Sequence, residues 1–440
     1  MRKAILILSL LLLAMLPAAL AEAAQASPPL IKVGLWSNQT SIVLSAAEGF
    51  SLADADSKET IGSFQAKEKV TVTFAASGIA INGQPAAARE LVAVLPAKAT
   101  AAIEVNRRQY RGAVSIRRTV GKNGLTVVNT LPLEEYVYGI IAREISPAWP
   151  AEAVKAQAVA ARTYALYSLG KHRGDGYDVC ATTDCQVYGG KTAEDTRAIK
   201  AVDDTRGVIV TYKGKPVPAY FHGSGGGFTE NSENVWGGHH PALRGVPDFD
   251  QKSPHYSWEK QMTQKEVEAA LESAGIKIGS LRTIELSPLT KPPVTSFDRG
   301  TSGRIKELRL VGSTGSVVVS GTKLRTILGL NSTLFDIKVT LPAEKSVQFE
   351  ITDSYGGRDT KTVPINVKPL PGKADKPNIR SVTGRANETI VFTGFGWGHG
   401  IGLSQWGAKA MAEKAPAGDT AYFREILKHY YTGVEISKLY

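Results

Sequence analysis

The sequence predicts an α+β protein in which a β-rich domain precedes a larger core of mixed helices and strands. Residues 28–122 contain short alternating or β-branched runs separated by Gly, Asn and Ser, which is typical of strands and turns. The rest of the chain combines helical periods with isolated strand patterns. With 440 residues, 43% of them hydrophobic, the chain can form more than one domain and bury a sizeable core. We expect a β-rich accessory domain at 28–122 and a mixed core at 127–440, with a β insertion around 343–390.

Residues 1–24 are typical of a secretory signal peptide. Arg2 and Lys3 precede an apolar run at 4–16 that is short for a membrane span. The sequence Ala-Leu-Ala at 19–21 fits the small-residue rule for cleavage. We therefore expect an exported protein, in the cell wall or at the outer face of the membrane, with an uncleaved anchor as the alternative.

The composition is basic, with a formal net charge of +11 at neutral pH. A basic exported protein suits an anionic cell envelope, such as an acidic polymer or lipid surface. The chain has no dense Lys/Arg run with interleaved aromatic residues, and we expect no nucleic-acid partner.

A helical pattern at residues 133–144 ends in a carboxylate. Glu144 takes the next position on a face of four apolar residues at i, i+4, i+7 and i+8. A carboxylate there points to the interior or into a cleft, and burial would raise its pKa toward the range useful for general-acid chemistry. The alternative is a helix-end glutamate that reaches solvent or pairs with Arg143 or Lys155. The four apolar residues are Leu133, Val137, Ile140 and Ile141.

A second, alanine-rich helix is expected at residues 151–169. Pro150 suits its first turn, and its small side chains allow neighbouring elements to pack close to the axis. Gln157 and Arg162 interrupt the alanines. They are either ordinary solvated positions or polar groups directed at the same cleft as Glu144.

The two cysteines form a C-x4-C pair, Cys180 and Cys185, and His172 lies eight residues before the first. Two cysteines in an exported protein normally indicate a disulfide. The competing interpretation is a zinc site of two thiolates and one imidazole, with Asp184, His222 or water completing the tetrahedron. The spacing allows both.

The segment 219–238, AYFHGSGGGFTENSENVWGG, follows the start of a strand predicted at 217–222 and continues into a glycine-rich loop. The glycines free the backbone to approach a ligand and to offer N–H groups to it, although a plain tight turn would look the same. Glu230 and Glu233 are potential second carboxylates for catalysis.

The segment 394–408, GFGWGHGIGLSQWGA, has glycine at every second position from 394 to 402. This alternation predicts a strand with glycines on one face and larger side chains on the other. Trp397 could then stack on a pyranose ring, His399 and Gln405 could bond hydroxyls, and Ser404 could cap a following helix. The alternative is a glycine corner with Trp397 in the core.

Three segments resemble, in order, the stage II sporulation protein D family (SpoIID/LytB): EISPAWPAEAVKAQAVAARTYAL and the two segments above. QVYGG at 186–190 also resembles a family element, whereas Leu403 and Trp406 replace the usual methionine and tyrosine. The resemblance covers about 131–440. It implies that Glu144 is the catalytic acid of a peptidoglycan lytic transglycosylase acting on glycan strands stripped of stem peptides.

The resemblance also implies a mixed helix and strand core and a set of substrate-binding residues. It favours a structural zinc at His172, Cys180 and Cys185, since some family members carry zinc in this region. Hydrolytic glycosidases use two carboxyl groups, whereas a lytic transglycosylase can work with one, and Glu144 is the one well-placed candidate. The implied binding residues are Gln157, Arg162, Tyr188, His222, Ser224, Trp397, His399, Ser404 and Gln405.

Two other functional classes remain open. One is a non-catalytic wall-binding module that stimulates a cell-wall amidase, as the LytB branch of the family suggests. The other is a zinc hydrolase centred on the cysteine pair, although the chain lacks an HExxH-like ligand helix.

Overall fold

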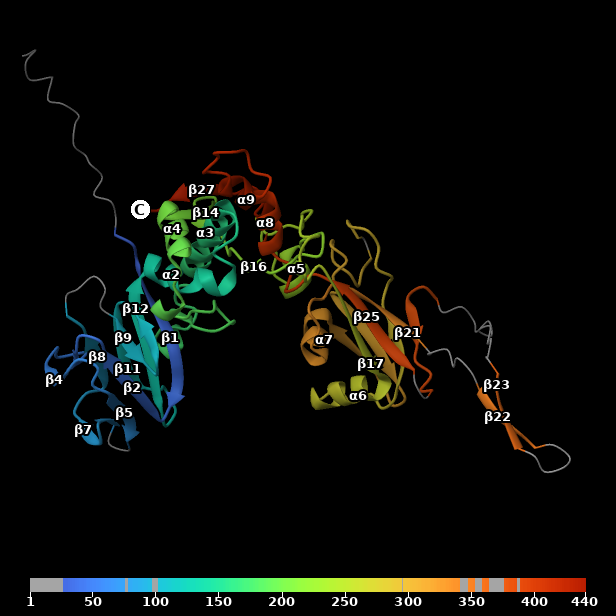
Figure 1. Ribbon diagram of the computed structural model, residues 1–440, viewed down its shortest axis with the longest axis horizontal. Coiled ribbons are helices and arrows are strands. Elements are labelled where there is room, and N and C mark those ends of the chain that lie inside the picture. Colours follow the sequence, from blue (N-terminus) through green and yellow to red (C-terminus); the bar gives the residue numbers. More distant parts are fainter. Residues whose placement is uncertain are drawn as a thin grey trace, which may run out of the picture. The chain divides into compact units, whose positions relative to one another are not determined.

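The computed structural model describes residues 27–75, 78–96, 102–294, 296–340, 347–352, 358–363, 376–385 and 388–440. The predicted signal peptide lies outside these residues. The chain forms two compact units: the first comprises Met1–Glu144, Ser168–Ile209 and Ile436–Tyr440, and the second Ile145–Tyr167 and Val210–Glu435. Helices and strands occur in both units, which confirms the predicted α+β class (Figure 1).

The first unit contains two sheets, built mostly from the predicted β-rich region (Figure 1). In β2, for example, Ile42 and Leu44 are fully buried while their neighbours face outward, as period-2 alternation predicts. The first sheet has the order β13 (Val179–Cys180), β1 (Leu30–Gln39), β12 (Leu125–Pro132), β11 (Ala113–Arg118), β8 (Glu90–Val94), β3 (Phe50–Asp54), β4 (Thr60–Phe64). The second has the order β10 (Arg108–Tyr110), β9 (Ile103–Val105), β2 (Ser41–Ala46), β5 (Val70–Ala75), β6 (Gly78–Ile81), β7 (Gln84–Ala86).

The first sheet continues beyond residue 122. β12 pairs antiparallel with both β1 and β11, and it runs directly into α2 (Leu133–Glu144). β13 pairs parallel with β1, which places Cys180 opposite Gly34. The start of α2 and the cysteine segment are therefore both fixed to strands of one sheet.

Helix α2 buries the predicted apolar stripe, and the period assigned to residues 133–144 is confirmed. Its buried Glu134 accepts hydrogen bonds from the Gly207 N–H at 2.9 Å and from the Tyr440 hydroxyl at 2.6 Å. Because both partners belong to the first unit, this carboxylate fastens the end of the chain to α2. Helix α4 (Thr196–Asp204) begins at the N-cap Asp195.

In the second unit, α3 (Ala151–Tyr167) is buried at every residue from Glu152 to Ala165. It packs against α8 (Gln405–Ala412) and α9 (Phe423–Tyr430), as its small side chains allow. Lys155 pairs with Glu152 at 2.8 Å and donates to the Thr420 carbonyl, and Glu152 accepts from the Phe423 N–H. The segment that leads into α9 is thus anchored to α3 within the same unit.

The remainder of the second unit is a β-rich part with one hydrophobic core. Helix α6 (Gln264–Ser273) starts with a capping box between Thr263 and Glu266. One sheet has the order β17 (Ser257–Thr263), β25 (Thr389–Phe395), β21 (Phe335–Thr340), and another β20 (Ser316–Ser320), β19 (Glu307–Gly312), β18 (Leu281–Glu285), β24 (Ile379–Ser381). Helix α7 (Gly321–Leu328) follows β20 in the sequence. The antiparallel pair β22 (Val347–Thr352) and β23 (Arg358–Val363) lies between β21 and β24 in the sequence.

One strand prediction was too long. Residues 217–222 were expected to be a strand, but only Phe221–His222 are, as β16, after the two-residue β15 (Lys215–Pro216) that pairs with β14 (Val208–Tyr212). Pro218 interrupts the pattern, because proline lacks the N–H that a ladder needs.

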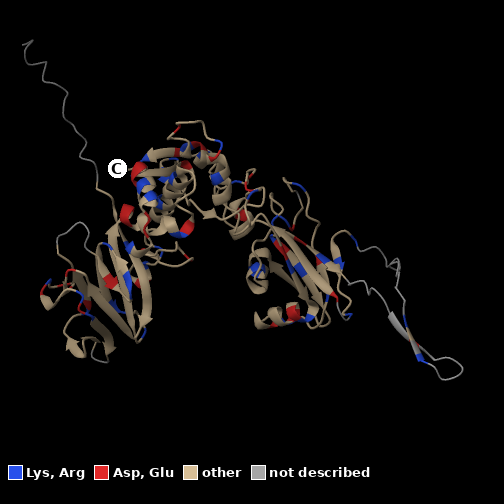
Figure 2. Cartoon of the chain, in the orientation of Figure 1, with Lys and Arg blue, Asp and Glu red and all other residues tan. Residues whose placement is uncertain are grey.

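Charged residues of both signs occur throughout the helices and strands of the two units (Figure 2). Among the described residues, none of the helices is long and apolar enough to cross a membrane.

Candidate functional site

Glu144 is the last residue of α2 and is half-buried, next to the exposed Arg143. The Tyr188 ring packs directly against helix α2 at Gly139. A Cβ at Gly139 would lie only 2.5 Å from this ring. The Tyr188 hydroxyl donates to Asn129 at 2.8 Å, and its side chain is only 3% exposed. Tyr188 therefore positions α2, and it is too deeply buried to contact a glycan as predicted.

Gln157 and Arg162 are both buried in α3, at 1% and 0% exposure. Neither is a solvated helix position, which excludes the simpler sequence interpretation. Among the described residues, the Gln157 amide has no hydrogen-bond partner for its oxygen or its nitrogen. In this conformation neither side chain presents surface to a polymer.

The glycine loop after His222 is held from inside by two aspartates. Asp248 accepts the Gly225 N–H at 3.0 Å, and Asp250 accepts the N–H groups of Gly226 and Gly227 at 2.8 and 2.9 Å. The buried Ser224 hydroxyl also donates to Asp250. The prediction that these N–H groups are offered to a ligand is therefore wrong, because the protein's own carboxylates occupy them.

Burial and, to a smaller extent, the neighbouring charge of Asp250 raise the pKa of Asp248 to about 6. The Tyr430 hydroxyl donates to Asp248 at 2.7 Å, which partly offsets the effect. These aspartates were missed from the sequence, where Asp248-Phe249-Asp250 lies in an unremarkable loop.

The two candidates for a second catalytic carboxylate are both bound to other groups of the protein. Glu230 is fully buried and accepts from the N–H groups of Asn231, Thr301 and Ser302 as well as from side chains. Glu233 forms an ion pair with Arg244, whose hydrogen bonds lower the Glu233 pKa to about 2. Because these partners occupy both carboxylates, neither is placed to act as a general acid or base.

The segment 394–402 does not form the predicted strand. β25 ends at Phe395, and the four following glycines adopt left-handed φ values of 73°, 108°, 82° and 70°. A Cβ at Gly396 would lie 2.6 Å from the Ser224 carbonyl, and one at Gly398 would lie 2.9 Å from the His222 Cβ. The glycines are thus needed for a left-handed backbone that approaches the second segment closely.

The two glycine-rich segments are joined directly. Ser224 and Trp397 exchange backbone hydrogen bonds of 3.1 and 2.8 Å, and β16 pairs parallel with β26 (Leu403–Ser404). Arg304, which is 1% exposed, donates to the Gly225 carbonyl at 2.8 Å and to the Gly398 carbonyl at 3.5 Å. Burial lowers its pKa to about 10, so the guanidinium stays charged near neutral pH. Nothing in the sequence singled out this arginine.

His222 and His399 form a ring pair with centroids 5.4 Å apart. Burial lowers the pKa of both, to about 3 for His399, and the Arg304 charge adds to the effect. His222 Nδ1 lies 3.2 Å from the Ile401 carbonyl, and His399 Nδ1 accepts the Ile401 N–H at 3.0 Å. The pair is therefore neutral, and it braces the backbone of the third segment.

Of the other predicted binding residues, Trp397 is 44% exposed and packs at a tilt against the exposed His255, with centroids 4.7 Å apart. Gln405 is partly exposed at the start of α8. Ser404 accepts the Gly407 N–H, so its predicted role as a helix cap is confirmed. Ser404 and Ser224 are completely buried and present no surface to a glycan.

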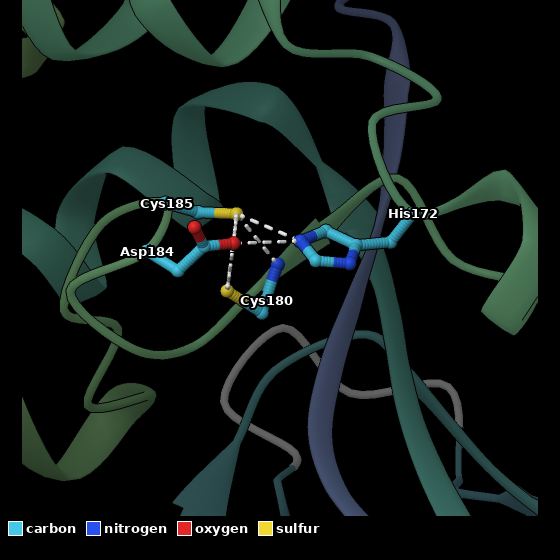
Figure 3. Close-up of side chains that lie close together, drawn as sticks. All are labelled: His172, Cys180, Asp184 and Cys185. Carbon is cyan, nitrogen blue, oxygen red and sulfur yellow. Dashed lines mark hydrogen bonds and ion pairs between the residues drawn. The ribbon is translucent and has the colours of Figure 1, made fainter. Parts of the chain in front are cut away.

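The predicted metal ligands converge in the first unit. His172, Cys180, Asp184 and Cys185 place one donor atom each within 4.8 Å of one another (Figure 3). The sulfurs are 3.0 Å apart, Cys185 Sγ is 3.4 Å from His172 Nε2, and that nitrogen is 3.1 Å from Asp184 Oδ2. Donor atoms around a tetrahedral zinc are separated by about 3.3–3.8 Å, so the cluster approximates such a site. Both cysteines are thiols in this structure.

The surroundings of the cluster orient its members. His172 stacks on Tyr177 with centroids 5.2 Å apart, and its Nδ1 lies 3.5 Å from Asp175. A hydrogen bond with Cys185 lowers the pKa of Cys180 to about 5, while the same interaction raises that of Cys185. The interaction thus favours ionisation of Cys180 over that of Cys185.

Comparison with known proteins identifies two matched regions. Residues 121–212 match the family described as stage II sporulation protein, and residues 240–354 match a domain of unknown function, DUF8618. An uncharacterized protein of Brachyspira hyodysenteriae is 31% identical over 71% of this chain and 68% of its own length. The amidase enhancer of Bacillus subtilis is 29% identical over 76% of this chain and 45% of its own. The stage II sporulation protein D of the same organism is 29% identical, over 74% and 79%.

Proposed function

The chain belongs to the stage II sporulation protein D family, and from that premise we propose that it is an exported peptidoglycan lytic transglycosylase with Glu144 as its single acid/base. The substrate would be glycan strands stripped of stem peptides. The observation that carries the proposal is the position of Glu144. It is half-buried at the end of a helix whose apolar stripe is buried as predicted, in the segment that resembles the family's catalytic motif.

The proposed reaction needs one carboxyl group. Glu144 gives its proton to the glycosidic oxygen between N-acetylmuramic acid and N-acetylglucosamine, and the bond from that oxygen to C1 breaks. The Glu144 carboxylate then takes the proton of the muramyl C6 hydroxyl, whose oxygen forms a bond to C1. The product has a 1,6-anhydro end, Glu144 is protonated again, and no water is consumed.

The engagement of the other carboxylates supports this one-group scheme. A hydrolase would use a second carboxyl group to activate water or to act as nucleophile. Glu230 is saturated with hydrogen bonds and Glu233 is paired with Arg244. Neither sequence-predicted candidate is available for that second role.

The test is product analysis by mass spectrometry after incubation with purified, denuded glycan strands. We expect anhydro-muramyl ends from the wild type and a loss of at least about 10²–10⁴-fold for Glu144→Gln, which keeps the volume but cannot exchange a proton. Glu135→Gln, the same change on the same helix, is the matched control and should retain activity. Reducing ends would indicate a hydrolase, and a folded Glu144→Gln variant with more than a tenth of wild-type activity would refute the assignment.

A second candidate is a non-catalytic stimulator of a cell-wall amidase. The similarity to a protein named amidase enhancer over 76% of this chain favours it. If denuded strands bind but are not cleaved, and a purified amidase is faster in the presence of the chain, this candidate replaces the first.

We further propose that His172, Cys180, Cys185 and Asp184 hold a structural zinc. The donor set of two sulfurs, one nitrogen and one oxygen suits zinc, and four protein donors leave no open position for a reactive water. An ion there would brace the loop between β13 and Tyr188, whose N–H donates to the Ala181 carbonyl. This argues against the zinc-hydrolase alternative and for a role in stability.

A further inference from the structure

Two of the six tryptophans are exposed, and both lie at the joined glycine-rich segments. Trp236 is 48% exposed and Trp397 is 44% exposed. A single exposed aromatic side chain needs no explanation, but two indoles on segments that are hydrogen-bonded to each other form a feature of the surface. Sequence reasoning selected Trp397 and missed Trp236, although both follow short motifs rich in glycine.

Trp236 is held in place on one side. It ends the short helix α5 (Ser232–Trp236), and the next residue, Gly237, adopts a left-handed φ of 79°. Its ring packs against Tyr220 with centroids 4.6 Å apart and against His399 with centroids 4.9 Å apart. The Glu233–Arg244 ion pair fixes the preceding turn of α5. The indole is therefore positioned before any ligand arrives.

Trp397 is held in a similar way on the neighbouring segment. Its backbone N–H and carbonyl both form hydrogen bonds with the backbone of Ser224. Its ring lies against Gly223, where a Cβ would be 3.5 Å from the indole Cδ1. The His255 ring packs against it at a tilt. We call Trp236 and Trp397, with the His399 and His255 rings on which they pack, the indole platform.

The chemistry of the platform suits an uncharged ligand. Burial keeps His399 neutral near pH 7, and the nearby Arg304 is buried and donates to backbone carbonyls. An anionic ligand such as a phosphate would require accessible cations, which these side chains do not offer. Indole rings combine a large apolar face with an N–H donor, and pyranose rings present C–H faces edged by hydroxyls.

We propose that Trp236 is a second glycan-stacking residue and that the indole platform binds neutral N-acetylhexosamine rings of the strand. This rests on the proposed function in that it assigns the platform to the same glycan. Trp236 contacts the ligand itself and does not act through another residue.

The probe is hexa-N-acetylchitohexaose, a neutral N-acetylglucosamine oligomer, titrated calorimetrically into the full chain carrying Glu144→Gln to prevent turnover. We expect Trp236→Ala and Trp397→Ala each to raise Kd about five- to tenfold, with Trp236→Phe recovering most of the affinity. Phe297→Ala is the matched control, because Phe297 is a 78% exposed aromatic in the same unit outside the platform. Thermal unfolding checks that each variant remains folded at the titration temperature, because about half of each indole is packed against neighbouring rings.

A Kd for Trp236→Ala equal to that of Phe297→Ala would overturn the inference, as would a chain that binds neither the hexamer nor denuded strands. The outcome is separable from that of the proposed reaction. If Trp236→Ala weakens binding but the wild type releases no anhydro ends, the platform stands and the transglycosylase proposal fails. If the wild type releases anhydro ends and Trp236→Ala binds normally, only the platform fails.

Discussion

Replacing Arg304 by methionine should destabilise the second unit strongly. The guanidinium is buried and donates to carbonyls of both glycine-rich segments, Gly225 and Gly398. Its charge also compensates the buried carboxylates of Glu230 and Asp250. Methionine fills a similar volume but removes the donor from both carbonyls and leaves the buried carboxylates with less charge compensation.

The expected cost follows from these two losses. A hydrogen bond to a charged group contributes about 1.5–3 kcal/mol, and removing one partner of a buried charge cluster costs about 3–5 kcal/mol in total. For a unit of this size, each kcal/mol shifts the melting temperature by about 2–4 °C, so we expect Tm to fall by at least about 6 °C.

Thermal unfolding followed by tryptophan fluorescence measures this shift. Arg309→Met is the matched control, because Arg309 is exposed on β19 and the described residues supply its side chain with no hydrogen bond or ion pair. That variant should stay within about 0.5 kcal/mol of the wild type. Arg304→Lys keeps the positive charge but not the several N–H donors of the guanidinium. Its melting temperature should therefore lie between those of Arg304→Met and Arg309→Met. If Arg304→Met melts within one or two degrees of Arg309→Met, the assignment of Arg304 as the link between the segments is wrong.

Two further predictions concern the cysteine cluster and the buried aspartate. Purified protein should contain about one zinc per chain. Cys180→Ser should lose the metal and unfold more easily, because metal affinity is part of the folding free energy. Elemental analysis that finds no metal, together with a Cys180–Cys185 disulfide by mass spectrometry, would contradict this prediction. The raised pKa of Asp248, about 6 against 3.8 when unfolded, means that the unfolded chain loses this proton first as pH rises. The contribution of Asp248 to stability is therefore greatest below about pH 4 and is lost through about pH 6. Asp248→Asn should flatten that part of a plot of Tm against pH, and an unchanged slope would show that Asp248 does not titrate there.

Local patterns were predictable from the sequence. The apolar stripe of α2 and the N-cap at Ser404 depend on residues within one or two turns, and both are confirmed. The C-x4-C pair with His172 predicted a cluster, and pairing of β13 with β1 then fixes the segment that carries it. Glu144 was placed at the end of the stripe, but its catalytic role remains a prediction.

The glycine-rich segments were not predictable in the same way. Alternating glycines are compatible with a strand and equally with a series of left-handed residues, and the choice depends on distant contacts of Gly396 with Ser224 and of Gly398 with His222. Arg304 and Asp250 escaped notice for the same reason. An isolated charge in a loop usually faces solvent, and its burial is decided by partners far along the chain.

These contacts explain why the residues predicted to touch substrate divide into two groups. Charged and hydroxyl groups in the second unit form hydrogen bonds that hold the glycine-rich loops. Asp250 accepts from backbone N–H groups and from the Ser224 hydroxyl, and Arg304 donates to a backbone carbonyl. The two large side chains that remain exposed on the joined segments, Trp236 and Trp397, are aromatic and uncharged. A surface of that kind would bind through stacking and apolar burial, both of which salt screens little, whereas the chain's net charge of +11 would favour an anionic envelope through interactions that salt weakens. Attraction to the envelope and recognition of the glycan would therefore depend on different residues and could be altered independently.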